Sequence, residues 1–214
     1  MLMSKKAMFM SMLVIASLFF LMFSQDIKAS EKIEDVPSDV LNKTMNEAVE
    51  DINNQLENGQ NKAEATKMIP GTDEGVIITV ENNELDNELN KGIAARAAKK
   101  PSGKKNYSVS VRSAKSRWVP GFSHTLRGTF TYSKGKVNKY SRNVVASGTA
   151  YTHTKSSKAV RLDKSLVEIT SVSKHKWLGK VGKISGLGYT SYLGVDLYGS
   201  GNYRLKYARY QPGL

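Results

Sequence analysis

Apolar and polar residues alternate along most of the second half of the chain. Tyr107, Val109 and Val111 are separated by serines, and a similar alternation runs from Leu126 to Tyr132. A period of two predicts strands with one buried face. Turn residues recur about every ten positions, which predicts a C-terminal antiparallel β-sandwich or small barrel over residues 107–214. The turns are expected at Gly135, Ser156-Ser157, Gly179, Gly186 and Gly199-Ser200-Gly201.

The same alternation predicts which side chains face solvent. If Leu126 and Phe130 are buried, Arg127 must point outward, because neighbouring residues of a strand face opposite sides. The last strand divides by this rule into an inward and an outward set. The inward set is Tyr203, Leu205 and Tyr207, and the outward set is Arg204, Lys206 and Ala208.

The residues before this β-domain follow a helical period. Apolar residues at spacings of three and four predict an amphipathic helix that begins at Ser38 and ends before Gly59. A short strand at 75–80 should follow, and the polar residues 81–90 suit a second short helix. The apolar face of the first helix is formed by Leu41, Met45, Ala48, Val49, Ile52 and Leu56.

An isolated helix of this length is marginal in water, so the predicted helix needs an apolar surface to cover. Two interpretations follow. The helix is an ordinary element packed on its own domain, or it belongs to an acidic pro-segment. In the second case it docks on the basic β-domain as an intramolecular partner until it is removed.

The first 29 residues have the layout of a signal peptide. Lys5 and Lys6 precede an uncharged apolar run, and the small residue Ala29 suits the cleavage position. A retained membrane anchor is the alternative, because the apolar run is close to the length that spans a bilayer. We therefore expect a secreted, extracellular protein. The absence of cysteine favours a bacterium that lacks an outer membrane.

Charge divides the remaining chain sharply. Residues 30–93 hold five lysines and fifteen acids, whereas residues 94–214 hold 24 basic residues and three acids. This shift predicts an acidic helical segment at 30–93, a basic flexible linker at 94–106 and a basic all-β domain at 107–214. The linker is small, basic and punctuated by Pro101 and Gly103, so proteolysis is expected there.

A short basic motif occurs twice, each time before a tryptophan. Lys115 and Arg117 precede Trp118, and Lys174 and Lys176 precede Trp177. The two tryptophans either lie in the core or serve as aromatic anchors beside the cations. The predicted anion-binding residues are Lys115, Arg117, Arg127, Lys174, Lys176, Arg204 and Lys206.

The residue types needed for most catalytic chemistries are scarce. Without cysteine there is no thiolate nucleophile or thiolate metal site. No nucleotide-binding or hydrolase motif occurs. His124 and His153 both lie in strand patterns and could meet in space, but no metal-ligand spacing links them. We therefore expect no enzyme activity, no cofactor and no metal site.

The net positive charge of the last 121 residues predicts an anionic partner. We expect a secreted cationic β-protein that binds anionic cell-wall polymers or anionic lipid surfaces. Its layout resembles that of secreted bacteriocins and cell-surface binding modules, which suggests antimicrobial action. Nucleic acid shares the electrostatics, but no recognition motif supports it. The alternative is a non-catalytic structural protein of an extracellular matrix or spore surface.

Overall fold

The computed structural model describes residues 38–70, 75–85, 102–114, 121–149, 151–177 and 188–212. The predicted signal peptide and most of the predicted linker lie outside these residues. The segment that contains Lys115, Arg117 and Trp118 also lies outside them, and so does the side chain of Trp177.

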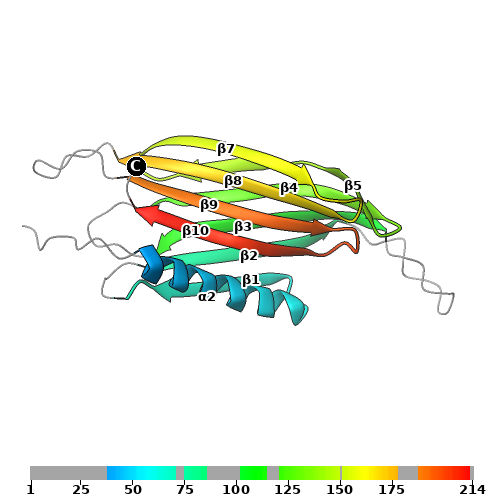
Figure 1. Cartoon of the computed structure of the whole chain (residues 1–214), viewed down its shortest axis with the longest axis horizontal. Helices are drawn as coiled ribbons and strands as arrows, with labels where there is room; N and C mark the ends of the chain where they lie inside the picture. Colours follow the sequence, from blue (N-terminus) through cyan, green and yellow to red (C-terminus); the bar gives the residue numbers. More distant parts are fainter. Residues whose placement is uncertain are drawn as a thin grey trace, which may run out of the picture. The chain divides into compact units, whose positions relative to one another are not determined.

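Two antiparallel sheets face each other and one helix lies along their side (Figure 1). This confirms the predicted mainly β, sandwich-like fold with a preceding helix. The six-stranded sheet contains β1 (Lys62–Met68), β2 (Gly75–Leu85), β3 (Gly103–Ala114), β4 (Ser123–Ser133), β5 (Lys136–Tyr140) and β6 (Asn143–Ser147), with β5 and β6 both pairing with β4. The four-stranded sheet has the order β10 (Tyr203–Pro212), β9 (Gly188–Tyr198), β8 (Leu166–Trp177) and β7 (Tyr151–Arg161).

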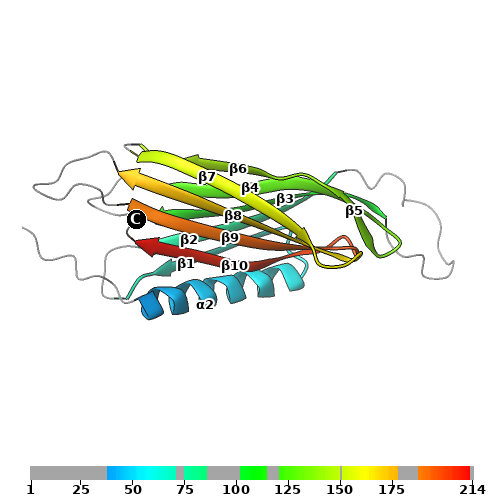
Figure 2. The same ribbon diagram turned by 45° about the horizontal axis from the view of Figure 1, so that its top comes forward.

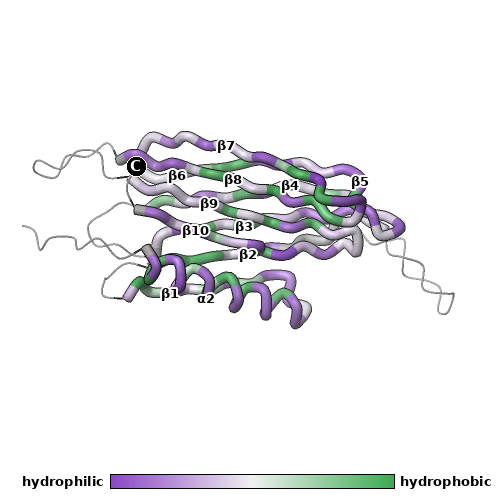
Figure 3. The backbone as a smooth tube through the Cα atoms, in the orientation of Figure 1, coloured by the Kyte–Doolittle hydropathy of each residue, from purple (hydrophilic) through white to green (hydrophobic). Residues whose placement is uncertain are grey.

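Alternate residues of both sheets form one core between them. Val109 lies opposite Leu126 in the six-stranded sheet, and Ile169 lies opposite Val195 in the four-stranded sheet; all four are fully buried. Figure 3 shows the result as short apolar stretches that alternate with polar ones along the strands. The period of two therefore locates the buried faces correctly in these strands.

A tyrosine from the four-stranded sheet links the two layers. The ring of Tyr203 is buried, and its hydroxyl donates a 2.6 Å hydrogen bond to the carbonyl of Glu81 on β2. Burial raises the pKa of this phenol, which keeps it protonated and able to donate. A buried ring with a satisfied hydroxyl is the environment that tyrosine favours in a core.

The predicted hairpin turn joins β4 to β5. Lys134 and Gly135 have φ values of 52° and 76°, as expected for a two-residue turn that needs positive φ at both positions. Nearby, one backbone hydrogen bond joins the two sheets. The amide of Val137 on β5 donates to the carbonyl of Lys164, between β7 and β8, at 2.9 Å.

Several segments differ from the expectation. The turn expected at Ser156-Ser157 is wrong, because both residues lie inside β7. Residues 103–106 of the predicted linker belong to β3.

β1 was not predicted, because only the small residues Ala63 and Ala65 point inward from it and their apolar signal is weak. The predicted helix at 81–90 is wrong for residues 81–85, which extend β2 and pair with residues 104–108 of β3. Pairing with a long neighbouring strand overrides the weak β propensity of these polar residues. Residues 86–90 lie outside the described residues.

Helix α2 (Ser38–Glu57) matches the predicted span and lies along one side of the sandwich (Figure 2). Its neighbours are β1 and β10, the edge strands of the two sheets, together with β2. The predicted apolar face is buried or half-buried against them. Leu41, Met45, Ala48 and Ile52 are almost inaccessible to solvent and belong to the core that the strands share.

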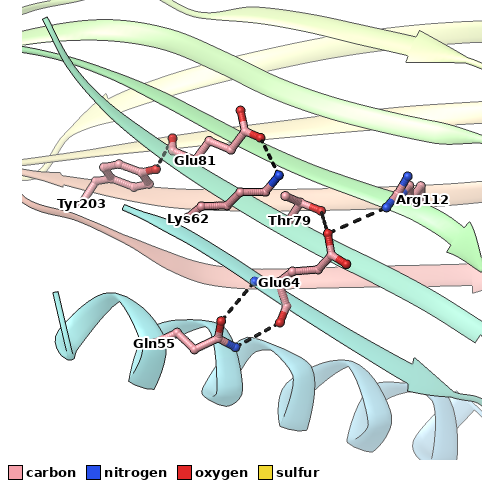
Figure 4. A network of polar contacts seen from close by, with 7 residues as sticks. All are labelled: Gln55, Lys62, Glu64, Thr79, Glu81, Arg112 and Tyr203. Atoms are coloured by element: carbon pink, nitrogen blue, oxygen red, sulfur yellow. Dashed lines mark hydrogen bonds and ion pairs between the residues drawn. The ribbon is translucent and has the colours of Figure 1, made fainter. Parts of the chain in front are cut away.

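Two side-chain amides of α2 pair with the backbone of both edge strands. Asn53 donates to the carbonyl of Leu205 on β10 at 2.9 Å and accepts from the amide of the same residue at 3.2 Å. Gln55 makes the same pair of hydrogen bonds with Glu64 on β1, at 3.0 and 3.2 Å (Figure 4). The helix thus satisfies backbone groups on both edges that would otherwise lack a partner.

The acidic segment therefore contributes to the same core as the basic strands. The compact unit begins at Val36 and includes α2, β1 and β2. Among its described residues, two ion pairs lie within the acidic segment, Lys67 with Asp51 and Lys62 with Glu81. Among the described residues, one ion pair joins the acidic and basic segments, between Glu64 and Arg112 at 3.8 Å (Figure 4).

Replacing Asn53 with alanine should lower the free energy of unfolding by about 2 kcal/mol, because a buried N–H and C=O of Leu205 lose their partners. Asn54 is exposed and next in sequence, so Asn54→Ala is the matched control and should change stability by under about 0.5 kcal/mol. Urea unfolding of both variants measures this difference. Equal values would contradict the edge-pairing role.

A protease site inserted between residues 94 and 98 tests how firmly the acidic segment is held. After cleavage at neutral pH, the two fragments should elute together in gel filtration, because β2 pairs with β3 along its whole length. Spontaneous separation without denaturant would instead support a removable pro-segment.

Candidate functional site: the outer face of the four-stranded sheet

The structure divides the predicted anion-binding residues between two opposite surfaces. Lys174 and Lys176 on β8, and Arg204 and Lys206 on β10, are exposed on the outer face of the four-stranded sheet. Arg127 on β4 is exposed on the outer face of the six-stranded sheet, because its neighbours Leu126 and Gly128 lie in the inward register. These cations therefore do not form one surface.

Two acids converge beside Arg204 and Lys206. Asp196 on β9 lies directly opposite Arg204 on one side and Glu168 of β8 on the other. The ammonium group of Lys206 is 2.8 Å from a carboxylate oxygen of Glu168. Two of the three acids after residue 94 are thus placed next to two of the predicted anion-binding residues. Lys206 is therefore ion-paired, and Arg204 lies directly opposite Asp196 in the ladder.

The environment of Asp196 is unusual for a carboxylate. Burial raises its pKa, the opposing influence of Lys206 is smaller, and the neighbouring Glu168 raises the pKa further. Its Oδ1 atom is inaccessible and has no hydrogen-bond partner among the described residues. The hydrogen bond to Glu168 raises the pKa of Lys206. This group of charges is consistent with a local structural role, because each cation lies next to an acid.

The remaining cations of this face have no such compensation. Within the described residues, no ion pair involves Lys174, Lys176 or Arg209. Arg209 lies directly opposite Tyr192 of β9, and its guanidinium carbon is 5.3 Å from the ring centre of Tyr207. We call these five residues the cationic–tyrosine patch: Lys174, Lys176, Tyr192, Tyr207 and Arg209.

Gly194 allows Tyr207 to lie flat on the sheet. A Cβ atom at residue 194 would be 2.5 Å from the Tyr207 ring, so no larger residue is accommodated without moving the ring. The ring then presents one half-buried face beside Arg209, in the geometry of a cation–π contact.

A β-bulge explains why Tyr207 and Arg209 were missed as surface residues of interest. The pairing of β10 with β9 shifts between Leu205 and Tyr207, which inverts the alternation beyond that point. The predicted inward position of Tyr207 and outward position of Ala208 are therefore wrong. Tyr207 is on the outer face and Ala208 is fully buried. The predicted period of two gives the correct buried face only in the part of β10 before the bulge.

The patch offers hydrogen-bond donors and aromatic faces without acids. Guanidinium and ammonium groups bind phosphate and carboxylate oxygens, and tyrosine rings can stack on sugar rings.

No cluster of three histidines, aspartates or glutamates suited to a metal ion occurs within the described ranges. Within this part of the chain, no helix has the length and apolar character needed to span a membrane.

Comparison with known proteins gives no match to a protein-family model, a curated protein or a solved structure.

Removing the ammonium group of Lys206 should expose the repulsion between Glu168 and Asp196. Lys206→Ala should lose about 1 kcal/mol of stability at pH 7. Loss of the cation raises the folded-state pKa of Asp196 further, so the deficit should shrink as the pH falls toward 4 and this acid becomes protonated. Urea unfolding at both pH values measures it.

The control is the double variant Lys206→Ala with Glu168→Gln, in which the repulsion is absent. It should show little of the pH dependence. A deficit of the same size in both variants and at both pH values would mean that Lys206 acts through packing alone.

Proposed function

We propose that this is a secreted cationic protein that binds anionic polymers of the bacterial cell envelope through the cationic–tyrosine patch. The observation that carries the proposal is that three cations, Lys174, Lys176 and Arg209, share one face without an acid partner among the described residues. Cations in this arrangement attract anions at long range and retain free donors for direct contact.

The spacing of these cations suits a chain with repeated negative charges. Lys174 and Lys176 are two residues apart on one strand, which corresponds to about 7 Å. Arg209 is on β10, two strands away from β8, which corresponds to about 10 Å across the sheet. It lies level with Val172, so it is offset from Lys174 by two residues, or about 7 Å, along the strand. One small anion cannot contact all three side chains on a flat sheet. A polymer of phosphate or carboxylate groups can do so at several points, and its sugar rings can contact Tyr192 or Tyr207.

The composition of the patch favours a polymer over a lipid bilayer. Its aromatic residues are tyrosines, and the aliphatic side chain next to them on this face, Val172 opposite Tyr192, is only half-exposed. The exposed large apolar residues in the described parts of the chain are Met68, Val160 and Leu162, none of which belongs to the patch. Binding at a bilayer surface usually combines cations with apolar side chains that enter the interface.

Bacteriocin-like antagonism is the more specific form of this proposal. An exported protein that accumulates on anionic wall polymers would be concentrated at the surface of neighbouring cells. The predicted signal peptide and the excess of basic residues after residue 94 are the features that support it.

The direct test is binding to purified bacterial cell walls, with and without their teichoic acids. We expect retention that decreases steeply as salt rises and is lost when the teichoic acids are removed. The triple variant Lys174→Gln, Lys176→Gln, Arg209→Gln should bind at least tenfold more weakly.

The matched control is Arg127→Gln, Lys136→Gln, Lys139→Gln. It removes the same charge from exposed positions of the six-stranded sheet. This control should weaken binding much less, because it changes the long-range attraction without touching the patch. Equal loss in both triple variants would show that net charge, and not the patch, determines binding.

Two other outcomes would replace the proposal. Equally tight, salt-sensitive binding to double-stranded DNA would favour a nucleic-acid partner. Concentration-dependent β-rich assemblies that ignore salt, with no wall binding, would favour the structural alternative.

A further inference from the structure

The four-stranded sheet has one covered edge and one open edge. Its strand order is β10-β9-β8-β7, and α2 lies along β10. β7 is the strand at the other end of the sheet, on the side away from the helix (Figure 1). It is eleven residues long, Tyr151–Arg161. A long edge strand without a cover offers its backbone to any chain that can pair with it.

The neighbouring edge strands of the six-stranded sheet are protected in other ways. β5 and β6 have five residues each, and a register shift interrupts the pairing of β5 with β4. The backbone of β5 is also engaged, because the carbonyl of Val137 accepts a 2.7 Å hydrogen bond from the guanidinium group of Arg161. Short and irregular edges are poor templates for a further strand. β7 is regular over its whole length.

The hairpin between β7 and β8 determines which backbone groups face the open edge. The amide of Leu162 donates to the carbonyl of Leu166 at 3.1 Å, so these two residues form a hydrogen-bonded pair. Hydrogen-bonded pairs alternate along an antiparallel ladder, so the even-numbered residues of β7 bond to β8. The N–H and C=O groups of the odd-numbered residues point away from the sheet. Within the described residues, no backbone hydrogen bond outside the ladder engages His153, Lys155, Ser157 or Ala159.

The first half of β7 is accessible on both faces as well as along its edge. Residues 152–156 are all exposed, whichever way their side chains point. A strand added here would have solvent on both of its faces. Polar or charged side chains therefore suit it better than apolar ones.

His153 shows how an inward-register side chain lies in this segment. Its Nδ1 is 3.1 Å from the Nδ1 of His175, its direct neighbour on β8. The sequence suggested a meeting of His153 with His124, but His124 is fully buried and contacts the hydroxyl groups of Ser171 and Ser191. His153 is exposed at the rim of the sheet and leaves the open edge uncovered.

Cations flank the open edge on both faces. Lys155 is in the inward register and Lys158 in the outward register, and both are exposed. Arg142, from the connection between β5 and β6, reaches β7 and donates from its Nε to the hydroxyl of Ser157 at 3.1 Å. Within the described residues, no ion pair involves these three cations. β7 contains no acid, and neither do residues 170–176 of β8, which lie opposite residues 152–158.

This charge selects the kind of chain that can pair with β7. Two copies of the protein joined through β7 would bring Lys155, Lys158 and Arg161 of both strands into one ladder without an acid. Like charges on neighbouring strands are destabilising, and lysine on an edge strand is a common protection against self-association. A strand that carries carboxylates would instead compensate the same cations.

We propose that β7 is a docking edge for an extended acidic polypeptide, which adds to the four-stranded sheet as a further strand. Its main chain pairs with the odd-numbered residues of β7, which recur about every 7 Å, as they do in any strand. Its carboxylates contact Lys155 and Arg142 on one face and Lys158 on the other. Sugar–phosphate polymers lack this alternating row of donors and acceptors. The inference does not depend on the proposed binding of wall polymers, which uses the outer face of the sheet.

The direct test uses the full chain without any wall polymer. The probe is a fluorescent capped peptide of alternating threonine and glutamate, and fluorescence anisotropy measures its binding. The control peptide has the same sequence and charge, but its central amides are N-methylated and cannot donate to a neighbouring strand. We expect the control peptide to bind at least tenfold more weakly. Equal binding of the two peptides would overturn the proposal, because charge alone would then account for it.

Two substitutions at residue 155 separate charge from backbone pairing. Lys155→Gln removes the cation and should weaken binding of the probe about threefold. Lys155→Pro removes the cation and also the outward N–H, which β8 does not use, and should weaken binding at least tenfold. The matched control Lys104→Gln removes one exposed charge on β3 and should change binding less than twofold. Equal losses in Lys155→Gln and Lys155→Pro would contradict strand addition.

Hydrogen exchange of the natural chain gives a test that requires no variant to fold. Without the probe, the amides of His153, Lys155 and Ser157 should exchange quickly, whereas those of Thr154 and Ser156 are protected by β8. Saturation with the probe should slow exchange of the three odd-numbered amides at least tenfold. A bound probe that leaves these rates unchanged would overturn the proposal.

Sedimentation without the probe tests whether a second copy occupies the edge. The natural chain should remain a monomer at the concentrations of the binding assay. A concentration-dependent dimer that Lys155→Pro abolishes would assign β7 to self-association and overturn the acidic partner.

Discussion

The fold depends on closing the side of the sandwich where the two sheets end. β1 and β10 each present backbone groups along an edge, and a sandwich that leaves both open would expose its core and its strands to other chains. α2 covers both edges, because the side chain of Asn53 pairs with the backbone of β10 and the side chain of Gln55 pairs with the backbone of β1. The two side-chain amides make the hydrogen bonds that the backbone of a neighbouring strand would otherwise make. The apolar face of the helix packs against the shared core.

The uneven distribution of charge is compatible with this shared core. Among the described residues of the acidic segment, Asp51 and Glu81 pair with lysines of that segment, and Glu64 pairs with Arg112 of the basic strands. The segment contributes apolar side chains to the core that the basic strands also form. On the four-stranded sheet, Glu168 and Asp196 lie next to Arg204 and Lys206, and the uncompensated cations lie elsewhere on the same face. The charged side chains and the core side chains lie on opposite faces of the same elements, so an uneven surface charge is compatible with a shared core.

Sequence patterns predicted the elements whose signals are strong and local. α2 and the buried positions of the long strands follow directly from their periods, whereas β1 has only two small inward residues and gave no signal. The site was predicted less well, because it depends on register. The opposition of Asp196 to Glu168, the pairing of His153 with His175 and the placement of Arg127 on the other surface all require knowledge of which strands are neighbours.

The bulge in β10 has a consequence for how this protein could change through evolution. One extra residue places Tyr207 and Arg209 on the outer surface and, in the same step, turns Ala208 and Tyr210 inward. Loss of that residue would exchange the two sets, so the surface would lose its tyrosine and arginine while the interior lost the ring of Tyr210, which stacks on Phe122. Two features on opposite sides of one strand are therefore inherited together. Drift by single insertions or deletions at this point should be strongly disfavoured, whereas substitutions remain free to adjust each side separately.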